Sequence, residues 1–179
     1  NVCLCLPKLY RRGISLNACY KSNKRIHQLI TTQPHNTMCL IIHKPTADTI
    51  IPQHILDNAE QINPDGFGIV YTDTNECIRT MDYNHAHELI IAKRPFVAHY
   101  RYATRGTIDK ATCHPYHVQD LIRLFSNGTV ADLGDDKTCD TAVVADYLKR
   151  YKQDTWEAIL SMTETRFAIT YPDGSVSRH

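Results

Sequence analysis

The sequence predicts a single α+β domain. Short apolar runs typical of strands alternate along the chain with segments whose apolar residues recur at helical spacing. The 179 residues are 42% hydrophobic and 22% charged, an ordinary globular composition, and a chain of this length buries a core without help from disulfides. No internal repeat or low-complexity linker divides the chain.

Charge is unevenly distributed along the chain. The formal net charge is +1, but residues 1–37 hold six basic residues and no acidic one. Residues 38–179 therefore carry 14 basic and 19 acidic residues, a net charge of −5. A mildly acidic body argues against a nucleic-acid partner. No apolar run approaches the roughly 18 residues of a membrane-spanning helix, so no membrane association is expected either.

Residues 1–37 are expected to form a basic leader outside the folded domain, which then spans residues 38–179. The leader lacks hydrophobic periodicity and mixes Lys and Arg with Ser, Asn and Thr. Three interpretations fit: a transit-like peptide, a propeptide cleaved before Cys39, and upstream sequence translated in frame with Met38 as the true start. We favour the third.

The cysteines show no disulfide framework. Seven are present, three in the leader and four widely spaced in the domain: Cys3, Cys5 and Cys19, then Cys39, Cys77, Cys113 and Cys139. Because no secretory signal is evident, we expect these thiols to be reduced and the protein to be intracellular and cytoplasmic.

In its first part the domain alternates strand, helix and hairpin. Leu40–Ile42 is an apolar run that indicates a buried strand. Apolar residues at helical spacing over 52–62, with Pro52 in the first turn, predict a helix. An Asn-Pro-Asp-Gly turn signal then leads into strands over 67–72 and 77–81, which we expect to pair as a hairpin.

The second part repeats the alternation. A short helix over 85–93 precedes a strand within 95–106, where side chains alternate until the chain turns polar at Thr104 and continues as a loop. The remaining expected elements are a strand over 121–126, a helix over 135–151 that begins with capping residues and ends in basic ones, a helix around Trp156 and a strand over 166–171, followed by a tight turn and the start of another strand.

Cys39 is the candidate nucleophile. It follows Met38 directly, so translation from Met38 and removal of that methionine leave Cys39 as the first residue. An N-terminal cysteine carries a thiol and a free α-amine, whose reference pKa of about 7.7–8.0 lets it accept the thiol proton near neutral pH. One residue then supplies nucleophile and base. The alternative is that Cys39 is a small apolar residue of a core strand.

Four short motifs occur in a fixed order. They read MCLII from Met38, HYRYATRG from His99, SNGT from Ser126 and CDTAVVADYL from Cys139. Together with CHPY at 113–116, this ordered set resembles the class II (N-terminal nucleophile) glutamine amidotransferases, the family of glucosamine-phosphate synthase, phosphoribosyl-pyrophosphate amidotransferase and asparagine synthetase. The resemblance covers roughly residues 38–171, and the ordered set is far more specific than any one motif.

The resemblance implies a role for each motif. Cys39 would be the nucleophile, and Arg101 would bind the α-carboxylate of L-glutamine with its planar guanidinium. Asp140 would bind the α-ammonium of the substrate. Asn127 and Gly128 would form the oxyanion hole, with a side-chain amide and a backbone N–H.

Two further residues of the matched motifs, Thr104 and His114, would join the substrate-binding set. His99, two residues before Arg101, is taken as structural support for that strand. The sequence departs from the family pattern at Tyr102, where Trp is usual, and at Ala142, where an acid is common; the second difference matters little for the chemistry.

Each assignment has a simpler alternative. Arg101 would suit an ordinary ion pair, and Asp140 would suit a helix N-cap. Asn127-Gly128 is also the commonest dipeptide of a type I′ hairpin turn. With Thr129 it further matches a glycosylation sequon, which is discounted without a secretory signal.

A zinc site is an alternative to these roles. Cys113, His114 and His117 lie close in sequence, but structural zinc needs a second pair of ligands at regular spacing, and Cys77 and Cys139 do not provide one. No metal or cofactor is therefore expected.

By resemblance, the expected fold is the four-layer αββα sandwich of N-terminal nucleophile hydrolases, lacking its C-terminal strands. The expected activity is hydrolysis of the glutamine side-chain amide through a cysteinyl thioester, giving glutamate and ammonia. The family usually joins this module to a synthase, and three interpretations fit a chain without one: ammonia passes to a separate synthase subunit, ammonia is released, or the chain is truncated. Two alternatives are an amidohydrolase acting on a γ-glutamyl or related amide, and a non-catalytic regulatory module of the same fold.

Overall fold

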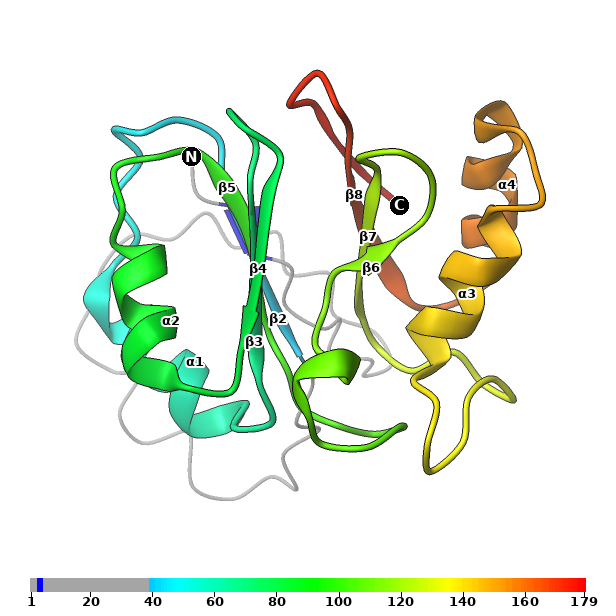
Figure 1. The fold of residues 1–179 in the computed structure, drawn as a ribbon, viewed down its shortest axis with the longest axis horizontal. Coiled ribbons are helices and arrows are strands. Elements are labelled where there is room, and N and C mark those ends of the chain that lie inside the picture. The colour runs from blue at the N-terminus through cyan, green and yellow to red at the C-terminus, as the bar shows by residue number, and fades with distance from the viewer. Residues whose placement is uncertain (1–2, 5–38) are drawn as a thin grey trace, which may run out of the picture.

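The computed structural model describes residues 3–4 and 39–179 of the chain. In this part of the chain, two antiparallel sheets and four α-helices make a mixed α+β fold (Figure 1), which confirms the predicted class.

The first sheet has the strand order β1-β2-β5-β3-β4, and every neighbouring pair is antiparallel. Its central strand β5 pairs on one side with β2, with Leu40 opposite Tyr100, and on the other side with β3. The bounds of its strands are β1 Cys3–Leu4, β2 Leu40–Lys44, β3 Phe67–Tyr71, β4 Glu76–Thr80 and β5 Phe96–Tyr100.

The second sheet has the strand order β6-β7-β8-β9 and is also antiparallel throughout. Its longest pairing joins β7 to β8 over five residue pairs, with Asn127 opposite Arg166 at one end. The bounds are β6 Tyr116–His117, β7 Arg123–Asn127, β8 Arg166–Thr170 and β9 Val176–Arg178.

Helices cover the outer face of each sheet. In Figure 1, α1 and α2 lie beyond the first sheet and α3 and α4 lie beyond the second, so the order of layers is helix, sheet, sheet, helix. The bounds are α1 Gln53–Ile62, α2 Tyr83–Ile90, α3 Asp140–Leu148 and α4 Trp156–Ser161, with short 3-10 turns η1 Lys110–Thr112 and η2 Gln153–Thr155.

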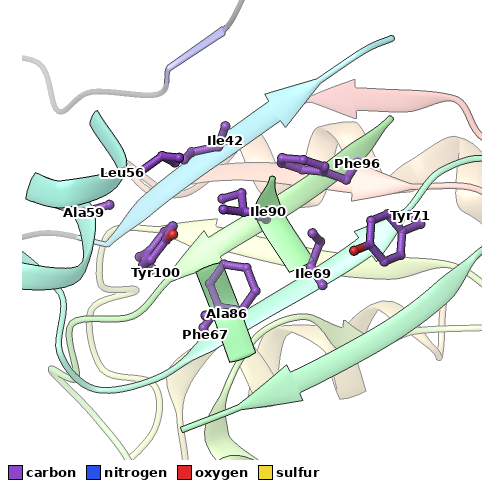
Figure 2. Close-up of a cluster of buried hydrophobic side chains, with 11 residues drawn as sticks. Ile42, Leu56, Ala59, Phe67, Ile69, Tyr71, Ala86, Ile90, Phe96 and Tyr100 are labelled. Atoms are coloured by element: carbon purple, nitrogen blue, oxygen red, sulfur yellow. The ribbon is translucent and has the colours of Figure 1, made fainter. Parts of the chain in front are cut away.

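Three apolar clusters hold these layers together. Figure 2 shows the first, where Leu56 and Ala59 of α1 pack on the sheet beside Ile42 and Tyr100. A second cluster, centred on Trp156, joins α3 and α4 to the second sheet. The third lies between the two sheets and consists of Ile41, Val70, Val97, Phe125 and Ala168. Burial of apolar surface at about 25 cal/mol per Å² makes these clusters the main source of stability.

Each predicted element is present, but several boundaries differ: the strand expected over 121–126 is β7 Arg123–Asn127, and the stretch expected as a loop after Thr104 contains the short strand β6 Tyr116–His117. The helix expected over 135–151 begins only at Asp140, because Asp135 accepts hydrogen bonds from the backbone N–H groups of Lys137 and Thr138 and holds this stretch in a turn. The helix expected over 85–93 is α2, which begins earlier because the Asp82 side chain accepts the N–H of Asn84 and caps it.

Most of the predicted leader lies outside the described residues. Cys3–Leu4 are described, and they pair with His43 and Ile42 of β2. For residues 1–2 and 5–37 the leader assignment stays a prediction. Among the helices in the described part of the chain, none has the length and apolar character needed to cross a membrane.

Candidate active site

Cys39 lies at the start of β2, beside the end of β5. Its Sγ accepts a hydrogen bond from the backbone N–H of Tyr102 at 3.3 Å and lies 3.4 Å from the Tyr102 carbonyl oxygen, to which the thiol donates. Burial raises the pKa of the Cys39 thiol to about 11, although the Tyr102 backbone bond and the charge of Arg101 lower it. The thiol is therefore protonated near neutral pH and needs a base to become a nucleophile.

No side-chain base is hydrogen-bonded to the Cys39 thiol in the described part of the chain. Among the described residues, the hydrogen bonds of the Cys39 Sγ go only to the backbone of Tyr102. A free α-amine on Cys39 would supply the missing acceptor from the same residue.

Residues from four distant segments meet Cys39 around one small hollow. Its volume is about 10 Å³, which is room for about one water molecule. Of the predicted site residues, Arg101, Thr104, His114, Gly128 and Asp140 line it with Cys39. Asn127 lies between two lining residues, but it is buried and does not itself line the hollow.

Arg101 is a buried cation, only 2% exposed. Its guanidinium donates hydrogen bonds to the carbonyl oxygens of Thr107 at 2.9 Å and Arg105 at 2.8 Å, which holds the following loop against it. Within the described part of the chain Arg101 forms no salt bridge, so the ordinary ion pair is not found here.

Asp140 is a buried anion, 3% exposed. It is not the N-cap of α3, as the simpler alternative held: Cys139 occupies that position, and Asp140 is the first helical residue. Its carboxylate accepts the backbone N–H of Val130 at 2.6 Å and that of Thr141 at 2.8 Å. Asp140 therefore fixes the loop that follows β7 and lies close to Gly128.

The alternative of a hairpin turn at Asn127-Gly128 is wrong. Asn127 is the last residue of β7, and the chain leaves the sheet at Gly128 and continues to α3. Gly128 has φ +136°, and a Cβ there would lie 3.2–3.4 Å from Thr165. The glycine is required because an L side chain rarely adopts this backbone conformation.

His114, which lines the hollow, stacks against the buried His99, with the two ring centroids 4.0 Å apart. His114 Nε2 is hydrogen-bonded to Ser126 Oγ at 3.2 Å and to Thr141 Oγ1 at 3.0 Å. His99 Nε2 is hydrogen-bonded to the Ser126 carbonyl at 3.0 Å, which ties the first sheet to the second. His99 is thus structural, as predicted, while Ser126 and Thr141 position His114. Neither partner was predicted, although both lie inside the matched motifs.

Burial keeps both rings neutral. It lowers the pKa of His99 to about 3, and it lowers the pKa of His114 well below the ordinary value, with the charges of Arg101 and Arg79 acting in the same direction.

These two shifts predict acid sensitivity. Below pH 6.5 each of these histidines is protonated in the unfolded chain but stays neutral in the folded protein. The free energy of unfolding therefore falls by about 1.4 kcal/mol per pH unit for each ring. The stability of the folded protein is therefore unaffected by these two rings above pH 6.5 and decreases as the pH falls from 6.5 towards their pKa in the folded protein. Urea unfolding between pH 7 and pH 5 measures the slope. His99→Gln should reduce it, and the exposed control His54→Gln should not. An equal slope in both variants would contradict the prediction.

The three residues of the alternative zinc site contact different partners. Cys113 Sγ lies 3.5 Å from Met81 Sδ, whereas the His114 ring contacts Ser126 and Thr141, and His117 Nε2 is hydrogen-bonded to the Asp120 carbonyl. Over the residues that the structure describes, His, Cys, Asp and Glu side chains form no group of three suited to hold a metal ion.

Comparison with known proteins does not place the chain in a family. The chain matches no protein-family model and no curated protein.

Proposed function

We propose that the protein is a glutamine amidotransferase that hydrolyses the side-chain amide of L-glutamine at Cys39. One observation carries the proposal: Arg101 and Asp140 are buried charges of opposite sign that line the same hollow as the thiol without pairing with each other.

Two buried, unpaired charges are costly unless something neutralises them. An α-amino acid head group carries one carboxylate and one ammonium, so it complements both charges at once. Arg101 uses two of its five N–H donors on carbonyl oxygens and retains others for a carboxylate. Asp140 Oδ1 accepts the Thr141 N–H and also lies 3.4–3.5 Å from Cys139 Sγ and Thr141 Oγ1, whereas Oδ2 accepts the Val130 N–H and retains a lone pair for an ammonium.

The side chain of a head group held in this way would extend towards Cys39. The α-amine of a processed Cys39 takes the thiol proton, and the thiolate attacks the amide carbon of glutamine. The tetrahedral oxyanion receives hydrogen bonds from the Asn127 amide and the Gly128 N–H. The α-ammonium of Cys39 then returns its proton to the amide nitrogen of the substrate. The tetrahedral intermediate collapses, which expels ammonia and leaves a thioester on Cys39. Water then releases glutamate and restores the thiol.

The layer order supports a more specific fold assignment. Two antiparallel sheets face each other across an apolar cluster, with a pair of helices on each outer face. We propose that this is the αββα sandwich of N-terminal nucleophile hydrolases, with ammonia passing to a separate synthase partner.

Glutamine binding requires the hollow to open, because about 10 Å³ does not hold an amino acid. The contacts that close it are few. Arg101 holds the carbonyls of Arg105 and Thr107, and Thr104 Oγ1 is 2.8 Å from Thr129 Oγ1 across the mouth. Because a substrate carboxylate would bind the remaining N–H donors of Arg101, the loop over 104–107 would have to move aside to admit it.

Arg101→Lys tests the head-group assignment. The charge is kept but the planar fork is lost, so glutamine binding should weaken by about 1.5–3 kcal/mol, roughly 10- to 150-fold. Calorimetric titration of glutamine into a Cys39→Ala background measures it. The matched control is Arg94→Lys, a partly exposed arginine paired with Asp73 and Glu76, which should leave binding unchanged.

Substrate analogues complete the test in the enzyme with a free Cys39 amine. 4-Carbamoylbutanoate lacks the α-ammonium and 4-aminobutanamide lacks the carboxylate, so both should be hydrolysed far more slowly than glutamine. Equal turnover of all three would refute the roles of Arg101 and Asp140. Faster turnover of γ-glutamyl methylamide would indicate the wider amidohydrolase activity, and no turnover of any amide would indicate a non-catalytic module.

A further inference from the structure

A second hollow, of about 450 Å³, lies at one edge of the two sheets and shares no lining residue with the candidate active site. Four of its lining side chains carry basic nitrogen groups: Arg79, Lys110, His117 and Arg123. No carboxylate lines it.

The strand registers direct three of these side chains into the gap between the sheets. On β4, Arg79 lies two residues after Cys77, which packs against the inter-sheet cluster, so the two share a face. On β7, Arg123 lies two residues before Phe125 of the same cluster. His117 lies directly opposite Arg123 on β6 and therefore faces the same way. At this edge of the molecule, the apolar side chains between the two sheets therefore give way to the basic side chains of Arg79, His117 and Arg123.

The cations of this hollow have no anionic partner. Within the described residues, Arg79, Lys110 and Arg123 form no salt bridge, and the undescribed stretches contain no Asp or Glu. Arg79 donates to the carbonyl oxygens of Ala111 and Pro115, and Arg123 donates to those of Asp120 and Ile122, which leaves their charges uncompensated.

Two nearby carboxylates are engaged elsewhere, and the exposed Asp120 contacts His117 and Arg123 through its backbone carbonyl rather than its carboxylate. Asp109 accepts hydrogen bonds from Thr107, Ala111 and Thr112, and Glu76 pairs with Arg94. Like charges gathered around one hollow repel each other, so an anion bound between them would relieve this repulsion. A hollow lined by four basic side chains and no carboxylate is unexpected in a domain whose net charge is −5.

We propose that this basic hollow binds a small phosphate-bearing ligand. Its volume lies within the range of about 300–1,000 Å³ that is typical of small-molecule sites. Two arginines offer the forked donors that match phosphate oxygens, and Lys110 adds a flexible point charge at the rim. A nucleic acid is disfavoured because the positive charge is confined to one hollow on an acidic domain.

Titration calorimetry with pyrophosphate as the probe tests the proposal. The double variant Lys110→Gln/Arg123→Gln should bind pyrophosphate at least tenfold more weakly than the unaltered protein. The control Lys137→Gln/Lys152→Gln removes the same charge from exposed sites outside the hollow and should bind as the unaltered protein does. Binding to the unaltered protein should weaken as salt is raised.

Three results would overturn the proposal: no pyrophosphate binding to the unaltered protein, equal weakening in both double variants, and tighter binding of a single-stranded oligonucleotide that the Lys110/Arg123 variant abolishes. Should the double variant fail to fold, the single change Lys110→Gln, at an exposed side chain, repeats the comparison with Lys137→Gln. Because the readout is binding without glutamine, the result is independent of the proposed hydrolysis.

Discussion

Cys39→Ala should abolish glutamine hydrolysis while leaving glutamine binding within about threefold. The thiol is the only proposed bond-forming group, whereas Arg101 and Asp140 hold the head group in the ground state. Release of glutamate and ammonia measures turnover, and calorimetry measures binding. Cys77→Ala, which removes a partly buried thiol from β4, is the matched control and should remain active.

Turnover above a few per cent in Cys39→Ala would mean that another residue is the nucleophile. The α-amine has its own test, because intact-mass measurement should show that active protein begins at Cys39. A stable chain that still carries residues 1–37 and hydrolyses glutamine would refute the amine mechanism.

Asn127→Ala should lower turnover by about 10²–10³ with little change in glutamine affinity. The amide would contact the substrate oxygen only once negative charge develops there, so its loss raises the barrier and spares the ground state. Single-turnover and steady-state kinetics separate the two effects. Asn58→Ala, a change on the exposed face of α1, is the control and should leave both constants unchanged.

Melting curves decide how a failure is interpreted. If Asn127→Ala is folded and turns over normally, the oxyanion is not held by this amide. If it mainly weakens binding while Arg101→Lys mainly lowers turnover, the two proposed roles are reversed.

Elements with strong local signals were predictable from the sequence. Nearby residues alone specify three of these elements: β2 by the apolar run after Cys39, α1 by the helical spacing of apolar residues after Pro52, and β3 by the turn before Phe67. The start of α3 was not predictable in the same way, because Asp135 competes for the backbone N–H groups that a helix would use.

For the candidate active site, the order of the motifs along the chain predicted which residues belong to it, but not their arrangement in space. That Arg101 and Asp140 are both buried yet unpaired depends on packing between β5, α3 and the loop after β7. The basic hollow was missed for the same reason: Arg79 and Arg123 are far apart in sequence, and only the strand registers show that they face one gap.

The hydrogen bond from His99 to the Ser126 carbonyl has a consequence for alignment. Apolar contact between the sheets is non-directional, so Ile41, Val97 and Phe125 alone would tolerate sliding of one sheet over the other. A buried polar bond at 3.0 Å does not, because a displaced sheet would leave both groups without a partner. Cys39 directly precedes β2 of the first sheet, and Gly128 directly follows β7 of the second. The relative position of Cys39 and Gly128 therefore depends on a directional contact in the buried layer between the sheets, and not on apolar packing alone.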